Sequence, residues 1–187
     1  MSSEKAIFRG RYLEFFRASC GWEYVSRIGS SGGITIVAIT QERRLLLVEQ
    51  NRAPLKGIAI ELPAGLVDIG EDELAAVKRE LAEETGYHCA DVRLLCIGAT
   101  SPGLTDEKNS VYFASGLIPI PGAPDDFPGE DGSIRRAIVR GVADEGERIT
   151  VHEVPVNGVL PWLSRQRERG AVVDLKVYAG LFFAMSQ

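Results

Sequence analysis

The sequence predicts a protein of the α+β class with one main domain. Its 187 residues correspond to one domain with room for a small appendage. Short runs of β-branched and aromatic residues separated by turn residues recur along the chain, while one stretch near the middle has clear helical periodicity. Hydrophobic residues make up 45% and charged residues 25% of the chain, which is the composition of a folded globular protein.

The first element is a small N-terminal β segment. Two short strands are predicted at residues 12–16 and 22–26, joined by a turn. A Ser-Ser-Gly-Gly sequence follows and marks a boundary. We therefore divide the chain into a β segment at residues 1–29 and a main domain at residues 30–187.

The main domain is expected to contain further strands and two C-terminal helices. The runs at residues 34–39 and 44–50 are predicted to pair as a hairpin across a short polar turn. Four later strands are expected at residues 58–62, 92–97, 110–115 and 149–154. Two helices are expected at residues 160–168 and 175–185. This mixture of strands and helices gives the α+β class.

The strongest helical signal covers residues 71–84. Leu74, Val77 and Leu81 recur at helical spacing and are expected to face the core. Acidic residues crowd the opening turn, as the helix dipole favours, and Gly86 should end the helix.

Three glutamates are spaced to share one face of this helix. Glu80, Glu83 and Glu84 stand at positions i, i+3 and i+4, so their like charges repel. Divalent cations would neutralise them, and ligation by oxygen alone suits Mg²⁺ or Mn²⁺ rather than zinc. The alternative is a solvated acidic face, which is common on glutamate-rich helices.

A longer pattern decides between these interpretations. From Gly65 to Tyr87 the chain reads Gly, five residues, Glu, seven residues, Arg-Glu-Leu, one residue, Glu-Glu, one residue, Gly-Tyr. The pattern resembles the Nudix box (GX5EX7REUXEEXGU, where U is a bulky aliphatic residue) at every fixed position, with tyrosine at the last U. The resemblance implies an α/β/α sandwich with the box as loop, helix and loop, and Mg²⁺-dependent hydrolysis of a nucleoside diphosphate linked to another moiety.

The resemblance also implies roles for individual residues. Glu80 and Glu84 match the metal-binding glutamates of the family, and Glu83 matches the supporting one. Ala64 matches the position whose backbone carbonyl completes the metal site. Arg79 is expected to hold a neighbouring carboxylate and to support catalysis rather than to contact substrate.

Features outside the box resemble the ADP-ribose and ADP-sugar pyrophosphatase subfamily. Pro102 follows the box by 15 residues, in a Ser-Pro-Gly-Leu sequence, like the downstream proline of that subfamily. We include Gly103 and Leu104 of this sequence among the predicted substrate contacts. Arg52 matches an arginine that helps to hold the phosphates or the terminal sugar.

The N-terminal segment resembles the part of the subfamily in which an aromatic residue stacks on the base. Trp22 and Tyr12 could hold adenine between their rings, and Arg27 would complete a clamp for base and phosphate. Alternatively, both rings are core residues of a small sheet. The subfamily resemblance further implies a homodimer that exchanges N-terminal segments.

The general base is expected on a loop after the box. In members of the subfamily a glutamate at the corresponding stretch orients or deprotonates the attacking water. We favour Glu145 as the base and Glu147 as a water-mediated metal contact. Glu107 is the other candidate for the base.

Charge and cysteine usage limit the partners and the compartment. Twenty-one basic and 26 acidic residues give a net charge of −5, which disfavours nucleic acids and acidic membranes as partners. No apolar run approaches the ~20 residues of a membrane helix. Three cysteines without metal-ligand spacing indicate reduced thiols and a cytoplasmic protein.

Together these features predict a Mg²⁺-dependent pyrophosphatase acting on ADP-ribose or a related nucleoside diphosphate sugar, with AMP and a sugar phosphate as products. One alternative is a Nudix hydrolase for another nucleotide, such as a CDP- or GDP-sugar, an oxidised nucleotide or a dinucleotide. The other is a non-catalytic module that binds a nucleotide sugar.

Overall fold

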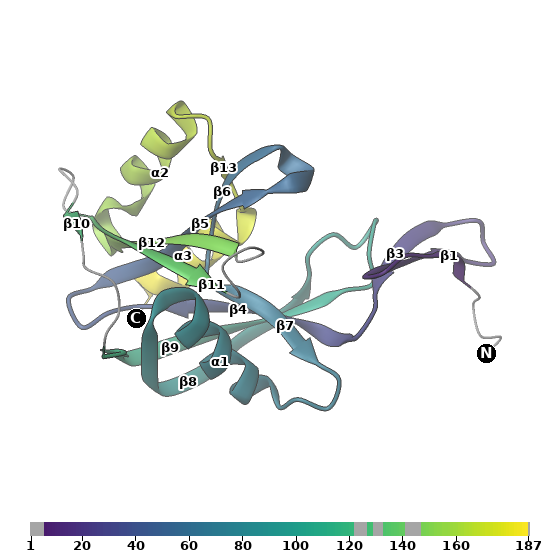
Figure 1. Cartoon of the computed structure of the whole chain (residues 1–187), viewed down its shortest axis with the longest axis horizontal. Coiled ribbons are helices and arrows are strands. Elements are labelled where there is room, and N and C mark those ends of the chain that lie inside the picture. The colour runs from purple at the N-terminus through teal and green to yellow at the C-terminus, as the bar shows by residue number, and fades with distance from the viewer. Residues whose placement is uncertain (1–5, 122–126, 129–132, 141–146, 187) are drawn as a thin grey trace.

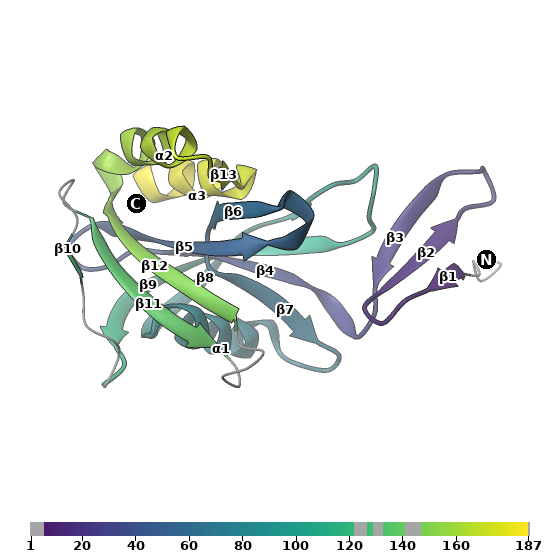
Figure 2. The ribbon, with the colours of Figure 1, turned by 45° about the horizontal axis from the view of Figure 1, so that its top comes forward.

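The computed structural model describes residues 6–121, 127–128, 133–140 and 147–186. Within these ranges the chain forms three β-sheets, three α-helices and two short 3-10 helices (Figure 1). One helix lies on one side of the two larger sheets, and the other two helices lie on the opposite side (Figure 2). The predicted α+β class is confirmed.

The sheets have three, six and four strands. The N-terminal sheet has the order β1-β2-β3, with β1 (Ala6–Arg9), β2 (Leu13–Arg17) and β3 (Glu23–Arg27). The six-stranded sheet has, in spatial order, β10 (Phe127–Pro128), β11 (Ile134–Arg140), β12 (Glu147–Pro155), β5 (Arg44–Arg52), β6 (Gly57–Glu61) and β13 (Val172–Val173). The four-stranded sheet has β7 (Ala64–Asp68), β4 (Ser30–Ala38), β9 (Lys108–Pro119) and β8 (Tyr87–Ala99).

The helices are close to their predicted positions. They are α1 (Glu73–Thr85), α2 (Val159–Glu168) and α3 (Leu175–Met185), with the 3-10 turns η1 (Ala53–Leu55) and η2 (Val156–Gly158). The Asp72 side chain accepts a hydrogen bond from the Ala75 amide and so caps α1. At the other end, Gly86 adopts a left-handed φ of 72°, which confirms it as the residue that ends the helix.

The predicted hairpin of residues 34–39 and 44–50 is wrong. The turn exists, because the Thr40 amide donates to the carbonyl of Arg44, but β4 and β5 then separate into different sheets and share only an isolated bridge between Ile39 and Leu45. Every residue from 33 to 40 is buried, so β4 is covered on both faces. Such a strand reads as a continuous hydrophobic run, which does not specify its pairing partners.

Side chains on the two faces of β4 pack into two different hydrophobic clusters. Val37 packs into the cluster that contains residues of α2 and α3, whereas Ile34 and Ile36 pack into the cluster that contains Val77 and Leu81 of α1. Because successive side chains of a strand point to opposite faces, β4 packs against α1 on one face and against the cluster of α2 and α3 on the other. The helices are consequently fixed to both faces of the same scaffold.

One predicted core residue of α1 lies outside the core. Leu74 is 44% exposed, because the buried stripe of the helix also includes Glu80 and Glu84 and is therefore rotated away from it. The carboxylates thus share a face with Val77 and Leu81, where the periodicity predicted only apolar side chains.

The N-terminal sheet projects from the body of the molecule (Figure 1). It contacts the body where the Val25 amide donates to the Leu104 carbonyl at 2.9 Å, beside a parallel bridge between Val25 and Thr105. Among the described ranges, none of the helices has the length and apolarity needed to cross a membrane.

Candidate active site

Two glutamates of α1 are buried under the helix. Glu80 is 3% exposed and Glu84 is 2% exposed, whereas the side chain of Glu83 is 42% exposed at the flank. Glu84 Oε2 accepts a hydrogen bond from the Ala64 amide at 2.9 Å, which ties the helix to the start of β7. The i, i+4 spacing therefore places two carboxylates against the strand that precedes the helix.

Gly65 makes room for the Glu80 carboxylate. A Cβ atom at this position would lie 2.0 Å from Glu80 Cδ and 2.1 Å from its Oε1, far inside van der Waals contact. Only glycine therefore allows the carboxylate to lie against the backbone of β7. This close approach gives a physical reason for the glycine that opens the sequence pattern.

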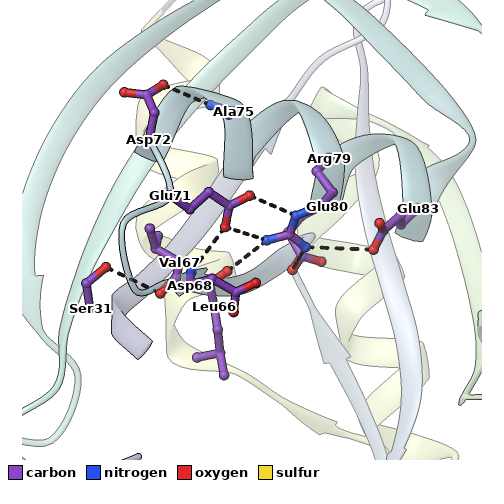
Figure 3. Close-up of polar contacts among 10 residues, drawn as sticks. All are labelled: Ser31, Leu66, Val67, Asp68, Glu71, Asp72, Ala75, Arg79, Glu80 and Glu83. Atoms are coloured by element: carbon purple, nitrogen blue, oxygen red, sulfur yellow. Dashed lines mark hydrogen bonds and ion pairs between the residues drawn. The ribbon is translucent and has the colours of Figure 1, made fainter. Parts of the chain in front are cut away.

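Arg79 connects the acidic side chains around the helix (Figure 3). Its guanidinium donates to both carboxylate oxygens of Glu71 at 2.9 Å, to Glu80 Oε1 at 2.6 Å and to the Leu66 carbonyl at 3.1 Å, and it lies 3.8 Å from Glu83 Oε2. The hydrogen bonds to Glu71 and Glu80 raise the pKa of Arg79, and the bonds between Arg79 and Glu71 lower the pKa of Glu71. Arg79 thus holds the carboxylates in place through its planar, permanently charged fork.

These carboxylates open into a cleft of about 590 Å³ between β4, β6, β7 and the start of α3. Six residues that the sequence analysis named as site candidates line it: Arg27, Arg52, Ala64, Glu80, Glu84 and Glu107. The other lining residues are Gly33, Ile34, Glu61, Gly65, Leu66, Thr100, Asn109 and Lys176. Residues far apart in the sequence therefore combine acidic and basic side chains around one cavity.

Two arginines of the cleft are held by carboxylates that also line it. Arg52 makes a bidentate contact with Glu61, with both hydrogen bonds at 2.7 Å. Arg27 Nε donates to Glu107 Oε2 at 2.8 Å. Each guanidinium is therefore fixed in orientation while its charge stays at the cavity.

The aromatic residues of the N-terminal sheet lie outside this cleft. Trp22 is 60% and Tyr12 is 62% exposed, so the alternative that both are core residues is wrong. Trp22 Nε1 donates to the Gly103 carbonyl at 3.3 Å, next to Leu104. The guanidinium of Arg11 lies 5.0 Å from the centre of the Tyr12 ring.

The lining residues that were not predicted as site residues include Glu61, Asn109 and Lys176. Glu61 directly precedes the Leu-Pro-Ala-Gly sequence at the box, so its position was the clearest available signal. Asn109 is 8% exposed at the start of β9, and Lys176 is the second residue of α3. Neither has a local motif, because only the tertiary fold brings these residues to the cleft.

The residues fit a hard divalent cation in donor chemistry. Glu80, Glu84 and the backbone of Ala64 offer oxygen ligands at one place, and the space kept by Gly65 admits the Glu80 carboxylate. Within the described ranges no group of three or more His, Cys, Asp or Glu side chains is placed to hold a metal ion. Glu145 and the side chain of Glu147 lie outside the described residues.

Comparison with known proteins identifies the domain. Residues 31–115 match the family model described as the NUDIX domain, so the chain contains a Nudix domain and the predicted family resemblance is confirmed. The Methanol dehydrogenase activator of Bacillus methanolicus is 45% identical, and the ADP-ribose pyrophosphatase of Bacillus subtilis is 37% identical, each over 86 residues. Each of these alignments covers 46% of this chain and 46% of the relative, which is about half of either protein.

Longer matches extend beyond the Nudix domain. The ADP-sugar pyrophosphatase of Mus musculus is 29% identical over 197 residues, covering 96% of this chain and 84% of the relative. A crystal structure of an ADP compounds hydrolase superposes with a TM-score of 0.58 at 20% identity, covering 86% of this chain and 81% of the other. That likeness shows the shared fold.

Proposed function

We propose that the protein is a metal-dependent pyrophosphatase that hydrolyses ADP-ribose or a related nucleoside diphosphate sugar to a nucleoside monophosphate and a sugar phosphate. One observation carries this proposal: the buried carboxylates of Glu80 and Glu84 share a cleft with Arg27 and Arg52. A pyrophosphate needs cations beside it, whereas a carboxylate cluster alone would repel it. The names of the relatives support the same substrate class.

The metal would be held by Glu80, Glu84 and the Ala64 carbonyl, with Glu83 in support. When bound, Mg²⁺ or Mn²⁺ would neutralise the pyrophosphate and activate the attacking water. Arg79 keeps the Glu80 carboxylate in position, because it is itself anchored by Glu71. Truncating Arg79 would therefore disturb catalysis without removing a substrate contact.

The arginines would bind and orient the substrate. A guanidinium offers paired N–H donors that match phosphate oxygens, and Arg52 and Arg27 both line the cleft. Arg27 belongs to β3, so it joins the cleft to the N-terminal sheet. We place the base of the nucleotide on that side, near Trp22, Gly103 and Leu104.

The exposed rings of Trp22 and Tyr12 support a further part of the proposal. Exposed rings of this kind could be covered by a purine or by a second subunit. We propose a homodimer in which N-terminal segments complete the binding sites. Light scattering of the wild type tests it: a monomer would contradict this arrangement.

The proposed general base is Glu145, with Glu147 as a water-mediated metal contact. Glu145→Gln should lower kcat by about 10²–10⁴-fold with little change in metal affinity, whereas Glu147→Gln should mainly weaken metal binding. Glu107 is the competing candidate, and its carboxylate is held by Arg27 at the cleft. A rate loss confined to Glu107→Gln would move the base to that residue.

The direct test of the proposed function is a panel of nucleoside diphosphate derivatives assayed with Mg²⁺, with Mn²⁺ and with EDTA, the products being separated by chromatography. Hydrolysis of ADP-ribose to AMP only when metal is present is the expected result. Glu84→Gln, which keeps the shape of the side chain, should lower kcat by at least ~10²-fold in the same assay. Full activity of this variant at saturating Mg²⁺ would contradict the metal assignment.

The same panel separates the alternatives. Preference for a CDP- or GDP-sugar, an oxidised nucleotide or a dinucleotide would assign another Nudix activity. Tight binding without hydrolysis would indicate a nucleotide-sugar-binding module. A small-molecule substrate rather than nucleic acid or membrane, and a cytoplasmic location, remain predictions from charge and cysteine usage.

A further inference from the structure

The start of α3 brings a third cationic side chain to the cleft. β13 pairs in parallel with β6, and the Asp174 amide donates to the Ile60 carbonyl at 2.9 Å. This pairing places the first turn of α3 beside Glu61, the last residue of β6. Lys176 thereby reaches the cleft, although 115 residues separate it from Glu61 in the sequence.

Lys176 differs from the two cleft arginines in its partner. Arg27 and Arg52 are paired with Glu107 and Glu61, which themselves line the cleft. The Lys176 ammonium is instead paired at 2.5 Å with Asp174, which is not among the lining residues. The counter-charge of Lys176 therefore lies outside the lining of the cleft.

The ion pair is not needed to start the helix. Asp174 caps α3 through its Oδ1, which accepts from the backbone amide of Lys176 at 2.7 Å, whatever side chain follows. Its other oxygen holds the ammonium. Any residue with a backbone N–H at position 176 would serve this cap, so the cap does not account for a lysine there.

The remaining donors of the ammonium suit an anion. A lysine ammonium carries three N–H donors and no acceptor, and one of them serves Asp174. The side chain is one-third exposed, so its head is reached from the cavity. Phosphate oxygens are the natural acceptors for such a compact charge.

We propose that Lys176, held from behind by Asp174, is a substrate-positioning residue that binds the pyrophosphate oxygens of the substrate. The assignment rests on the proposed function, because it takes the nucleoside diphosphate as the occupant of the cleft. Asp174 fixes the direction of the ammonium, so the cation is oriented before the substrate arrives. The pyrophosphate then meets Arg52 and Lys176 from β5 and α3, and Glu80 and Glu84 with their metal from α1.

Binding of an uncleavable substrate analogue tests the assignment without turnover. Binding of methylene-bridged ADP-ribose is measured by calorimetry in Mg²⁺ and separately in EDTA. The Kd of Lys176→Met should be about tenfold or more higher than that of the wild type, because the variant lacks a hydrogen bond from a charged donor. Lys176→Arg should recover most of the affinity. Binding of adenosine, which has no phosphate, should not change, and the Kd of Lys176→Met should depend less on salt because one phosphate contact is lost.

A matched control is available on another helix. Lys78 is an exposed lysine of α1 outside the cleft, so Lys78→Met removes the same charge without touching the lining. It should leave the Kd and its salt dependence unchanged. Circular dichroism of all three variants checks that α3 is intact, because the Asp174 cap is kept.

Each outcome separates this assignment from the proposed function. An unchanged Kd for Lys176→Met, or an equal loss for adenosine and the analogue, would overturn the role of Lys176 even when the wild type hydrolyses ADP-ribose. If the wild type binds the analogue through Lys176 but hydrolyses no member of the substrate panel, the pyrophosphatase proposal fails and the binding assignment stands.

Discussion

Replacing Gly65 with alanine should displace the Glu80 carboxylate. The new Cβ would lie 2.0 Å from Glu80 Cδ, whereas non-bonded carbon atoms prefer about 3.5 Å or more, so the carboxylate must shift by about 1.5 Å. It would also strain the contact between Glu80 and Arg79, whose guanidinium is fixed by Glu71. A misplacement of about 1 Å in a catalytic arrangement costs about 10²-fold in rate, and overpacking costs about 1–3 kcal/mol of stability.

The assay combines turnover with metal titration. Gly65→Ala should lower kcat for ADP-ribose by about 10²-fold and raise the Mg²⁺ concentration needed for half-maximal rate, while circular dichroism shows a folded protein. Gly98→Ala is the matched control. A Cβ at Gly98, on β8, would meet no atom within 4 Å, so this variant should behave as the wild type.

A second substitution tests the cause of the loss. Shortening Glu80 to aspartate in the Gly65→Ala background returns the space of one methylene, so the double variant should lose less activity than the two single effects combined. Normal activity and metal dependence in Gly65→Ala would refute the reasoning, because Glu80 could then leave its observed position without consequence.

Two other predictions concern stability and base recognition. The hydrogen bond from buried His152 lowers the pKa of Glu49. This bond therefore stabilises the fold above the unfolded-state pKa of Glu49, and the stabilisation is lost as the pH falls through the lower folded-state pKa. Urea unfolding of Glu49→Gln should show a free energy of unfolding about 1 kcal/mol below that of the wild type at pH 7 and no difference in acid, whereas an equal difference at both pH values would contradict the pairing. Trp22→Ala should raise the KM for ADP-ribose about tenfold with a smaller change in kcat. Trp22→Phe keeps a ring but loses the hydrogen bond to Gly103, so its KM should stay within about threefold of the wild-type value. Equal increases in KM for the two variants would show that the hydrogen bond, and not stacking, matters.

The local elements were predictable because local rules determine them. Asp72 and Gly86 bound α1 through cap chemistry, and α3 has the predicted limits of Leu175 and Met185. The strand β7 was not predicted, since its sequence Ala-Gly-Leu-Val-Asp follows a proline and contains a glycine, which are turn signals. Its pairing with β4 decides that it is a strand.

The composition of the cleft was only partly predictable. The family pattern identified Ala64, Glu80 and Glu84, because their spacing along one helix and the preceding loop is local. Glu61 and Lys176 depend on the pairing of β6 with β5 and β13, which no local pattern specifies. Long-range pairing therefore limits what the sequence alone can predict of the substrate-facing side.

The burial of Glu80 and Glu84 contradicts the interpretation of α1 as a solvated acidic face at these two positions. A solvated acidic face would leave its carboxylates in water, where they cost nothing. Here they are 3% and 2% exposed, and removing a carboxylate from water costs several kcal/mol unless hydrogen bonds and opposite charge compensate it. Arg79 and the Ala64 amide offset part of that cost, and the absence of a side chain at Gly65 leaves room for the Glu80 carboxylate. Apolar side chains could fill the same stripe of α1 without that desolvation cost, so packing alone does not explain the two carboxylates. The metal and the anionic substrate that we propose for this cleft would account for them.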